Sequence, residues 1–161
     1  MTMMLKYRQG EASGHEPYHY RECGLDDVYL MNGVRFQEVD GETGVIILNI
    51  DGLHRAIARN IVMNKSLMGG RDVRFLRKHL ELTQADLAKW LACDPQTVAR
   101  WEKDQTKIPG SADRLTRMLY ASTHLHGVDL PAMIRDVADL DAAAGKQVFR
   151  ETSGKWARAA A

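Results

Sequence analysis

The stretch DPQTVARWEK carries three polar side chains whose chemistry suits the recognition of base-pair edges. They are Gln96, Thr97 and Arg100. An arginine can form two parallel hydrogen bonds with guanine, a glutamine can do the same with adenine, and a threonine methyl can contact thymine. Residues four apart lie on the same face of a helix, so Gln96 and Arg100 would point the same way. The residue types and their spacing therefore predict a surface that reads bases.

Three further side chains are candidates for contacts with a phosphate backbone. Gln84 lies in the first turn of the preceding predicted helix, where its amide and the exposed helix-end N–H groups can bond a phosphate. Lys103 and Lys107 follow the base-reading stretch; they contact phosphates or, alternatively, are solvated loop lysines. The predicted DNA-binding set is Gln84, Gln96, Thr97, Arg100, Lys103 and Lys107.

Two short helices, over 83–91 and 95–103, must position these side chains. Thr83 and Asp94 are of the residue types that cap helix N-termini, and each directly precedes an amphipathic run. Pro95 would occupy the first helical position of the second helix, where its missing N–H costs no hydrogen bond. These signals predict a helix, a tight turn and a second helix.

The apolar residues of both runs predict a shared core. Ala88 lies where the two helices would cross, and its small side chain permits close approach. Trp101 is expected in the core, whereas Trp90 is expected in partly exposed packing. The other predicted core positions are Leu87, Leu91 and Val98.

A helical hairpin that only fills a core is the alternative to a base-reading helix. In that case Arg100 would form an ion pair within the chain. Its acidic neighbours, Glu102 and Asp104, lie two and four residues further along. The exposed positions of Gln96 and Arg100 favour DNA reading over this alternative.

Residues 69–140 are predicted to form an all-α domain of five helices. The first carries Val73, Leu76 and Leu80 on one face. Pro109-Gly110 breaks the chain, and Ser111 is expected to cap the fourth helix. Asp129 is expected to cap the fifth. The fourth and fifth helices, with Met133, Ile134 and Val137, are the candidates for the dimer seam.

Residues 18–68 are predicted to form a small antiparallel β-meander with one helix. Asn32-Gly33 is a strong hairpin signal, and a second turn is expected at 40–44. Asp51 is expected to cap a helix whose stripe of Leu53, Ile57 and Ile61 covers the strands. The chain is thus predicted to be α+β, with a flexible leader over 1–17 and a frayed tail over 141–161.

Composition limits the function classes. The 161 residues carry a formal net charge of +1, but residues 71–120 hold 10 Lys and Arg against 7 Asp and Glu. This excess has the sign that phosphate binding requires. No run approaches the ~18 apolar residues of a membrane span, no signal peptide is visible, and the two cysteines lack a CxxC spacing. We expect a cytoplasmic protein.

His15, His19 and Cys23 form an H-x3-H-x3-C pattern, which is conceivable as a metal site. Pro17 forbids a regular helix there, and no fourth ligand follows clearly. No Walker loop, GxGxxG, GxSxG or HExxH motif occurs. We therefore expect no enzyme activity, no catalytic residues, no cofactor and no metal, although the role of these three residues stays open.

The segment LTQADLAKWLACDPQTVARWEKDQTKIPGSADRLTRMLY resembles the Cro/repressor-like helix-turn-helix family of the xenobiotic-response-element type. In that family Leu-Thr-Gln opens the second helix and TVARWEK matches the recognition helix. The Pro-Gly-Ser pattern and the helix after it resemble the C-terminal half of MqsA-type antitoxins. The resemblance spans roughly residues 71–120 and implies that Gln96 and Arg100 read bases.

This resemblance implies a lambda-repressor-like DNA-binding domain and a transcriptional regulator, with an autoregulating repressor as the expectation. It would bind double-stranded DNA as a homodimer. The alternative is an antitoxin whose N-terminal module binds a toxin protein. A third hypothesis is that this module binds a small ligand. The chain departs from the family in having Ala92 where glycine is usual, and it lacks the paired CxxC motifs of the MqsA-type zinc module.

Overall fold

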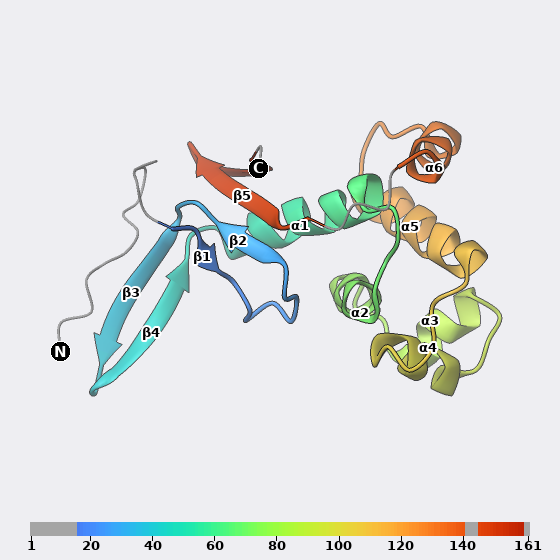
Figure 1. Ribbon diagram of the computed structural model, residues 1–161, viewed down its shortest axis with the longest axis horizontal. Helices are drawn as coiled ribbons and strands as arrows, with labels where there is room; N and C mark the ends of the chain where they lie inside the picture. The colour runs from blue at the N-terminus through green and yellow to red at the C-terminus, as the bar shows by residue number, and fades with distance from the viewer. Residues whose placement is uncertain (1–15, 141–144, 160–161) are drawn as a thin grey trace. The chain divides into compact units, whose positions relative to one another are not determined.

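The computed structural model describes residues 16–140 and 145–159, and it is an α+β protein (Figure 1). The strands are β1 (Tyr18–His19), β2 (Val28–Leu30), β3 (Val34–Val39), β4 (Glu42–Ile47), β5 (Gln147–Thr152) and β6 (Lys155–Arg158). The helices are α1 (Ile50–Asn64), α2 (Gly70–His79), α3 (Gln84–Trp90), α4 (Pro95–Glu102), α5 (Gly110–His124) and α6 (Leu130–Ala138). Across these residues no helix is both long and apolar enough to cross a bilayer. Most of the predicted leader, residues 1–15, lies outside the described residues.

The chain divides into two compact units. The described part of the first, the strand unit, comprises residues 16–57 and 145–159. The described part of the second, the helical unit, comprises residues 58–140. The first half of α1 belongs to the strand unit and its second half to the helical unit.

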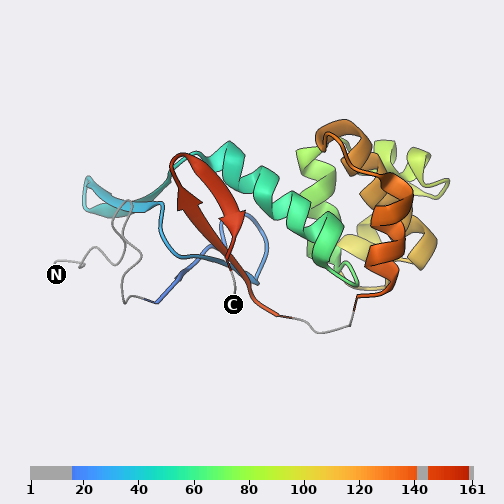
Figure 2. The same cartoon turned by 90° about the horizontal axis from the view of Figure 1, so that it is seen from above.

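The strand unit contains a four-stranded mixed sheet with the order β1-β2-β5-β6. Strand β2 pairs antiparallel with β1 and parallel with β5, placing Leu30 opposite Phe149. Strands β5 and β6 form an antiparallel hairpin, visible as the red strands of Figures 1 and 2. The predicted frayed tail is therefore wrong for residues 147–158, which supply half of this sheet.

Asn32-Gly33 does not form the predicted two-residue hairpin, because β2 and β3 belong to different sheets. The Asn32 side chain instead extends the pairing with β5: its Nδ2 donates to the Glu151 carbonyl at 2.8 Å, and its Oδ1 accepts from the Glu151 N–H at 2.7 Å. Gly33 has a φ of +74°, and a Cβ there would lie 2.7 Å from the Trp156 ring. Glycine is thus needed for close packing as well as for the turn.

Strands β3 and β4 form a separate two-stranded hairpin with Val34 paired to Ile47 and Val39 to Glu42. Asp40 and Gly41, both with positive φ, make its two-residue turn, so the second predicted turn is confirmed. The continuous three- or four-stranded antiparallel meander is replaced by this hairpin and the mixed sheet.

Helix α1 carries the predicted apolar stripe, because Leu53, Ile57 and Ile61 are all fully buried. Its capping residue differs from the prediction. Asn49 Oδ1 accepts from the Gly52 N–H at 3.2 Å, whereas Asp51 lies inside the first turn. Asparagine is as good a cap as aspartate.

Helices α2 to α6 make up the predicted five-helix region. Thr83 caps α3 by accepting from the Asp86 N–H, and Asp129 caps α6 by accepting from the Ala132 N–H, as predicted. Ser111 does not cap α5: the helix begins at Gly110, directly after Pro109. Proline has a fixed φ and suits the extended residue before a helix, so the break and the helix start coincide.

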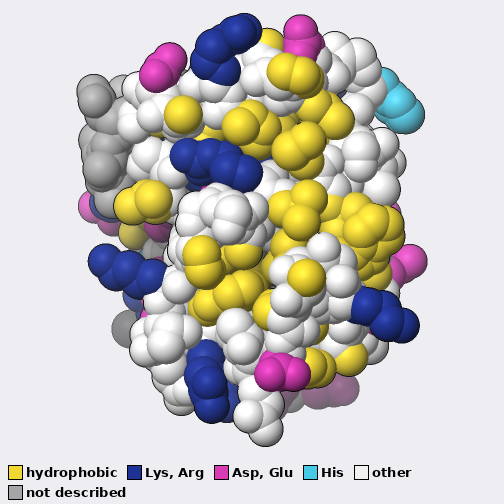
Figure 3. All heavy atoms as spheres, turned by 90° about the vertical axis from the view of Figure 1, so that its right-hand side faces the viewer, with side chains coloured by type: hydrophobic (Ala, Val, Ile, Leu, Met, Phe, Trp, Pro, Cys, Tyr) yellow, Lys and Arg dark blue, Asp and Glu magenta, His cyan; other side chains and the backbone are white. Residues whose placement is uncertain are grey.

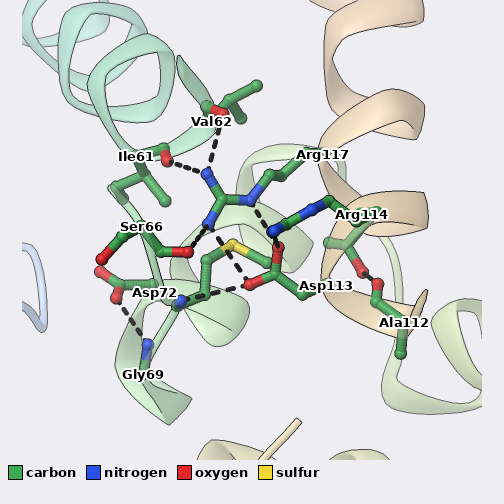
Figure 4. Close-up of polar contacts among 11 residues, drawn as sticks. Ile61, Val62, Ser66, Gly69, Asp72, Ala112, Asp113, Arg114 and Arg117 are labelled. Atoms are coloured by element: carbon green, nitrogen blue, oxygen red, sulfur yellow. Dashed lines mark hydrogen bonds and ion pairs between the residues drawn. The ribbon is translucent and has the colours of Figure 1, made fainter. Parts of the chain in front are cut away.

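A fully buried arginine ties α5 to the C-terminal end of α1 within the helical unit (Figure 4). Arg117 donates to the carbonyls of Ile61 and Val62 at 3.1 and 3.0 Å. Its Nε lies 2.6 Å from Asp113 Oδ1. The carbonyls at a helix end have no partner within the helix, so a cation there satisfies acceptors that would otherwise be buried and unpaired.

Candidate nucleic-acid interface

Helices α3 and α4 form the predicted helix-turn-helix pair, and Ala92 makes the turn between them. Ala92 has a φ of +54°, the left-handed conformation that the usual glycine adopts easily. Its N–H donates to the Lys89 carbonyl at 3.4 Å, and the Cys93 N–H donates to the Ala88 carbonyl at 3.0 Å. This pair of bonds is the Schellman arrangement that ends a helix. Ala92 thus makes the turn between α3 and α4 without a glycine.

The apolar residues expected between α3 and α4 are buried. Leu87 and Val98 are fully buried, Ala88 is 1% exposed and Trp101 is 5% exposed. Leu91 is half-buried. Trp90, expected in partly exposed packing, is 61% exposed.

Helix α4 separates its side chains cleanly into two faces. Val98, Trp101 and Glu102 are buried. Gln96, Arg100 and Lys103 are exposed and recur with the helical period on the opposite face. Thr97 is half-buried at the edge between them. Of the predicted base-reading residues, Gln96 and Arg100 therefore share one accessible face, whereas Thr97 lies at its edge.

Both acidic neighbours that could hold Arg100 in an ion pair bond elsewhere. Glu102 turns inward to Arg77, whose Nε lies 2.6 Å from Glu102 Oε1. Asp104 Oδ1 accepts from the Gly70 N–H at 2.8 Å. Within the part of the chain that the structure describes, the Arg100 side chain makes no hydrogen bond or ion pair, so its guanidinium can meet a ligand.

Gln84 lies at the start of α3, beside the end of α4. Its Nε2 donates to Glu102 Oε2 at 2.8 Å, so its amide is oriented by the same carboxylate that holds Arg77. Arg77 also donates to the Leu82 carbonyl at 2.9 Å. An amide NH2 carries two hydrogens, so the second remains for another acceptor.

The close contact between the start of α2 and the end of α4 was not apparent from the sequence. A Cβ on Gly70 would lie 2.1 Å from the Trp101 carbonyl oxygen. Glycine is therefore required for this close approach of two backbones. The only local sign is an unexplained glycine pair directly before an amphipathic run.

In the capping box of α3, hydrogen bonds from Thr83 stabilise the negative charge of the Asp86 carboxylate. Asp86 Oδ2 accepts from the Thr83 hydroxyl at 2.7 Å and from the Thr83 N–H at 2.9 Å. These two bonds lower the pKa of the Asp86 carboxyl. The carboxylate also lies at the positive end of the helix, where a negative charge is favourable.

Exposed charge in residues 71–120 is mostly positive, because seven exposed Lys and Arg outnumber four exposed carboxylates. The cations are Arg71, Arg74, Lys78, Lys89, Arg100, Lys103 and Lys107; the carboxylates are Glu81, Asp86, Asp94 and Asp104. Lys103 and Lys107, both predicted phosphate contacts, are exposed. In Figure 3, cationic groups are distributed around a broad area of hydrophobic side chains on the face of the helical unit.

Two residues of the H-x3-H-x3-C pattern, His19 and Cys23, lie within the described part of the chain. His15 lies outside the described residues. His19 bonds through both ring nitrogens, accepting from Arg21 Nε at 3.2 Å and contacting the Asp26 carbonyl at 2.6 Å. Burial raises the pKa of the Cys23 thiol to about 11, which disfavours the thiolate that metals bind. No cluster of three or more metal-type ligands occurs among the residues that the structure describes.

Cys93 is half-buried at the turn between α3 and α4. Partial burial and, to a lesser extent, the neighbouring Asp94 raise its thiol pKa. A raised pKa keeps the sulfur protonated and weakly nucleophilic near neutral pH.

The candidate dimer seam on α6 is largely covered within the protomer. Met133 and Val137 are 4% and 1% exposed, so they are buried within the protomer, and only Ile134 is half-buried. Exposed large hydrophobic side chains in the helical unit lie elsewhere, at Leu67, Trp90 and Leu115.

Comparisons with protein-family models, with curated proteins and with solved structures find no match to this chain.

Proposed function

We propose that this protein is a sequence-specific DNA-binding transcriptional regulator, acting as an autoregulating repressor, which inserts α4 into the major groove. The observation that carries the proposal is the division of α4 into two faces. The side chains of Gln96, Arg100 and Lys103 are exposed on one face, whereas Trp101 and Glu102 fix the other against the helical unit. A helix held rigidly by one face and carrying Gln and Arg on the other suits direct readout of base edges.

The surroundings of α4 support the same proposal. Gln84 and the first N–H groups of α3 lie at a helix N-terminus, which attracts phosphate. The Arg77-Glu102 pair sets the end of α4 and orients the Gln84 amide. Lys103 and Lys107 add positive charge along the same stretch and would contact phosphates without reading sequence. In this proposal the five helices α2 to α6 form a repressor-like DNA-binding domain.

The protein would bind DNA as a homodimer, because one recognition helix reads only a few base pairs. Two copies related by a two-fold axis read an inverted repeat with half-sites about one helical turn apart, roughly 34 Å. The dimer would use exposed apolar residues of the helical unit, such as Leu115 or Trp90.

The proposal is tested by selecting binding sites from a library of random duplex DNA with the full-length protein. We expect enrichment of an inverted repeat, and the same selection with Arg100→Ala should relax one position of each half-site. The enriched sequence should also occur upstream of the gene that encodes the protein. Enrichment of no sequence over the input library, at a salt concentration where any binding persists, would contradict the proposal.

A second function, binding of a partner protein by the strand unit, is favoured by the β3–β4 hairpin. Val39 is 56% exposed, Ile46 is 43% exposed and Val45 is 36% exposed. A two-stranded hairpin is marginally stable when both faces meet water, and exposed apolar strands commonly mark protein contacts. A toxin protein neutralised by this hairpin would make the chain an antitoxin that also represses its own gene.

The partner proposal is tested by co-expressing the chain with the product of the adjacent gene and isolating any complex. Val39→Lys together with Ile46→Lys should abolish the complex while leaving DNA binding intact. Arg35→Lys, on the same hairpin, is the matched control and should leave the complex intact. A complex that survives the double change would assign the contact to another surface, and absence of any complex would remove this second function.

A further inference from the structure

A cavity of about 280 Å³ opens in the helical unit between the start of α2, the end of α4 and the start of α5. Its apolar walls come from Leu67, Met68, Val73, Trp101 and Ile108. An apolar cavity of ~150 Å³ can already hold benzene in a protein interior. This cavity therefore has room for a single ring, or a short aliphatic chain, together with a polar group.

The carboxylates that line the cavity are already satisfied by the protein. Asp113 accepts from Arg117 Nε at 2.6 Å, from Arg114 at 3.0 Å and from the Met68 N–H at 3.2 Å (Figure 4). Asp104 accepts from the Gly70 N–H at 2.8 Å. Neither carboxylate needs a cation from a ligand.

Two cationic side chains line the cavity, and Arg114 is paired with Asp113 whereas Lys107 has no such partner among the described residues. Its side chain is exposed, and within the described residues no hydrogen bond or ion pair involves it. A cavity with apolar walls, carboxylates already hydrogen-bonded by the protein and one ammonium group without a partner complements a small molecule that is apolar at one end and anionic at the other.

We propose that this cavity binds a small monocarboxylate with an aromatic or short aliphatic body. The body would lie against Trp101 and Val73, and the carboxylate would pair with Lys107. Apolar contact would supply most of the affinity, because a pair formed with an exposed lysine adds little.

The chain offers a substitution that closes the cavity without disturbing its walls. Gly110 lines the cavity, and a Cβ placed on it would meet no atom within 4 Å. Gly110 is exposed, so Gly110→Leu should place a side chain at the opening of the cavity while α5 stays folded. Gly70 is unsuitable, because its Cβ would collide with the Trp101 carbonyl. Ser111→Leu, one residue further along and exposed, is the matched control.

The test is a titration of the full-length protein followed by ¹H–¹⁵N NMR at the Trp101 indole N–H and the Ile108 amide. The probes are benzoate, phenylacetate and hexanoate, each compared with its neutral amide. We expect saturable shifts with at least one acid, and binding of its amide about fivefold weaker, as for loss of one exposed ion pair. Lys107→Gln should bring the acid down to the affinity of the amide.

Gly110→Leu should abolish the shifts, and Ser111→Leu should leave them unchanged. Three outcomes overturn the proposal: no saturable shift with any of the three acids, equal affinity for acid and amide, or unaltered binding in Gly110→Leu. A change of oligomeric state in Gly110→Leu without acid binding to the unaltered protein would instead assign the cavity to contact between copies.

Occupancy of the cavity would also affect DNA binding, and this consequence rests on the proposed function. Trp101 belongs to α4, the proposed recognition helix, and Lys107 would be drawn from a phosphate to the ligand. Saturating acid should therefore weaken binding to the selected DNA site. The NMR titration contains no DNA, so failure of acid binding and failure of DNA binding are separate results.

Discussion

Arg77 on α2 and Glu102 at the end of α4 form a two-pronged ion pair that is nearly inaccessible to water. Arg77 Nε lies 2.6 Å from Glu102 Oε1, and the terminal Nη2 lies 3.2 Å from Oε2. The side chains are 11% and 3% exposed. Gln84 on α3 donates to the same carboxylate, so one charge pair joins the three helices that surround the proposed interface.

Removal of one partner of this pair should destabilise the helical unit strongly. Glu102→Ala leaves the Arg77 guanidinium buried without its counter-charge, which should lower the free energy of unfolding by about 3–5 kcal/mol. The double change Arg77→Met with Glu102→Leu removes both charges and should cost much less. Urea unfolding followed by circular dichroism measures both, and equal losses in the single and double variants would show that the charge pair is not the cause.

The turn at Ala92 should be improved by glycine. An L-residue in the left-handed region costs roughly 1–2 kcal/mol, and glycine escapes this cost but loses more chain entropy on folding. Ala92→Gly should therefore raise the free energy of unfolding by about 0.5–1 kcal/mol. The same change within α4, Ala99→Gly, should lower it by about 1 kcal/mol. Thermal or urea unfolding compares them, and two changes of the same sign would refute the role assigned to the Ala92 backbone.

The C-terminal strands should be essential to the strand unit. Phe149 on β5 is fully buried, and its replacement by alanine should cost about 3–5 kcal/mol. Arg150, the next residue, is exposed, and Arg150→Ala should change stability by less than about 0.5 kcal/mol. Hydrogen exchange of the β2 amides provides the readout. Unchanged protection of β2 in Phe149→Ala would mean that β5 contributes little to the sheet.

His54 should make the strand unit lose stability in mild acid. Burial lowers the pKa of His54 below its usual 6.5, more than Asp51 raises it, and His54 Nε2 lies 2.9 Å from the Tyr20 hydroxyl. The unfolded chain therefore takes up a proton at a higher pH than the folded chain. Stability is complete above pH 6.5 and falls as the pH drops through the lowered pKa.

The measurement is the urea midpoint of the strand unit at several pH values between 7.5 and 5. His54→Phe cannot be protonated and should remove the part of the slope that His54 contributes. His126→Phe, at an exposed position, is the control and should keep the slope of the unaltered protein. An identical slope in His54→Phe would exclude this histidine as the source.

Local signals allowed much of the helical region to be predicted. The caps Thr83 and Asp129, the proline at the start of α4 and the buried Trp101 follow from patterns of neighbouring residues. Helix ends were harder. Helices α2, α3 and α4 each end in a left-handed residue that is not glycine, namely Glu81, Ala92 and Asp104. Their conformation depends on tertiary packing and leaves little trace in the sequence.

The mixed sheet could not be predicted, because its pairing is not local. Strand β5 pairs with β2 more than a hundred residues away, and its side chains alternate polar and apolar only weakly: Gln147 and Phe149 are both buried. Asn32-Gly33 has the composition of a hairpin turn, but it connects β2 of one sheet to β3 of the other. Among the candidate site residues, the exposed face of α4 followed from helical period, whereas the bond from Gln84 to Glu102 required the structure.

The central claim is that Arg100 reads a base, and the most direct measurement is fluorescence anisotropy on the selected DNA site and a scrambled duplex across a range of salt. Arg100→Ala should weaken binding to the selected site by about 1–3 kcal/mol and spare the scrambled duplex. Lys103→Ala should weaken both and reduce the salt slope by about one unit. Arg135→Ala, an equal loss of charge on α6, should change neither affinity. If Arg100→Ala and Lys103→Ala weakened both duplexes alike, α4 would not be the helix that reads sequence.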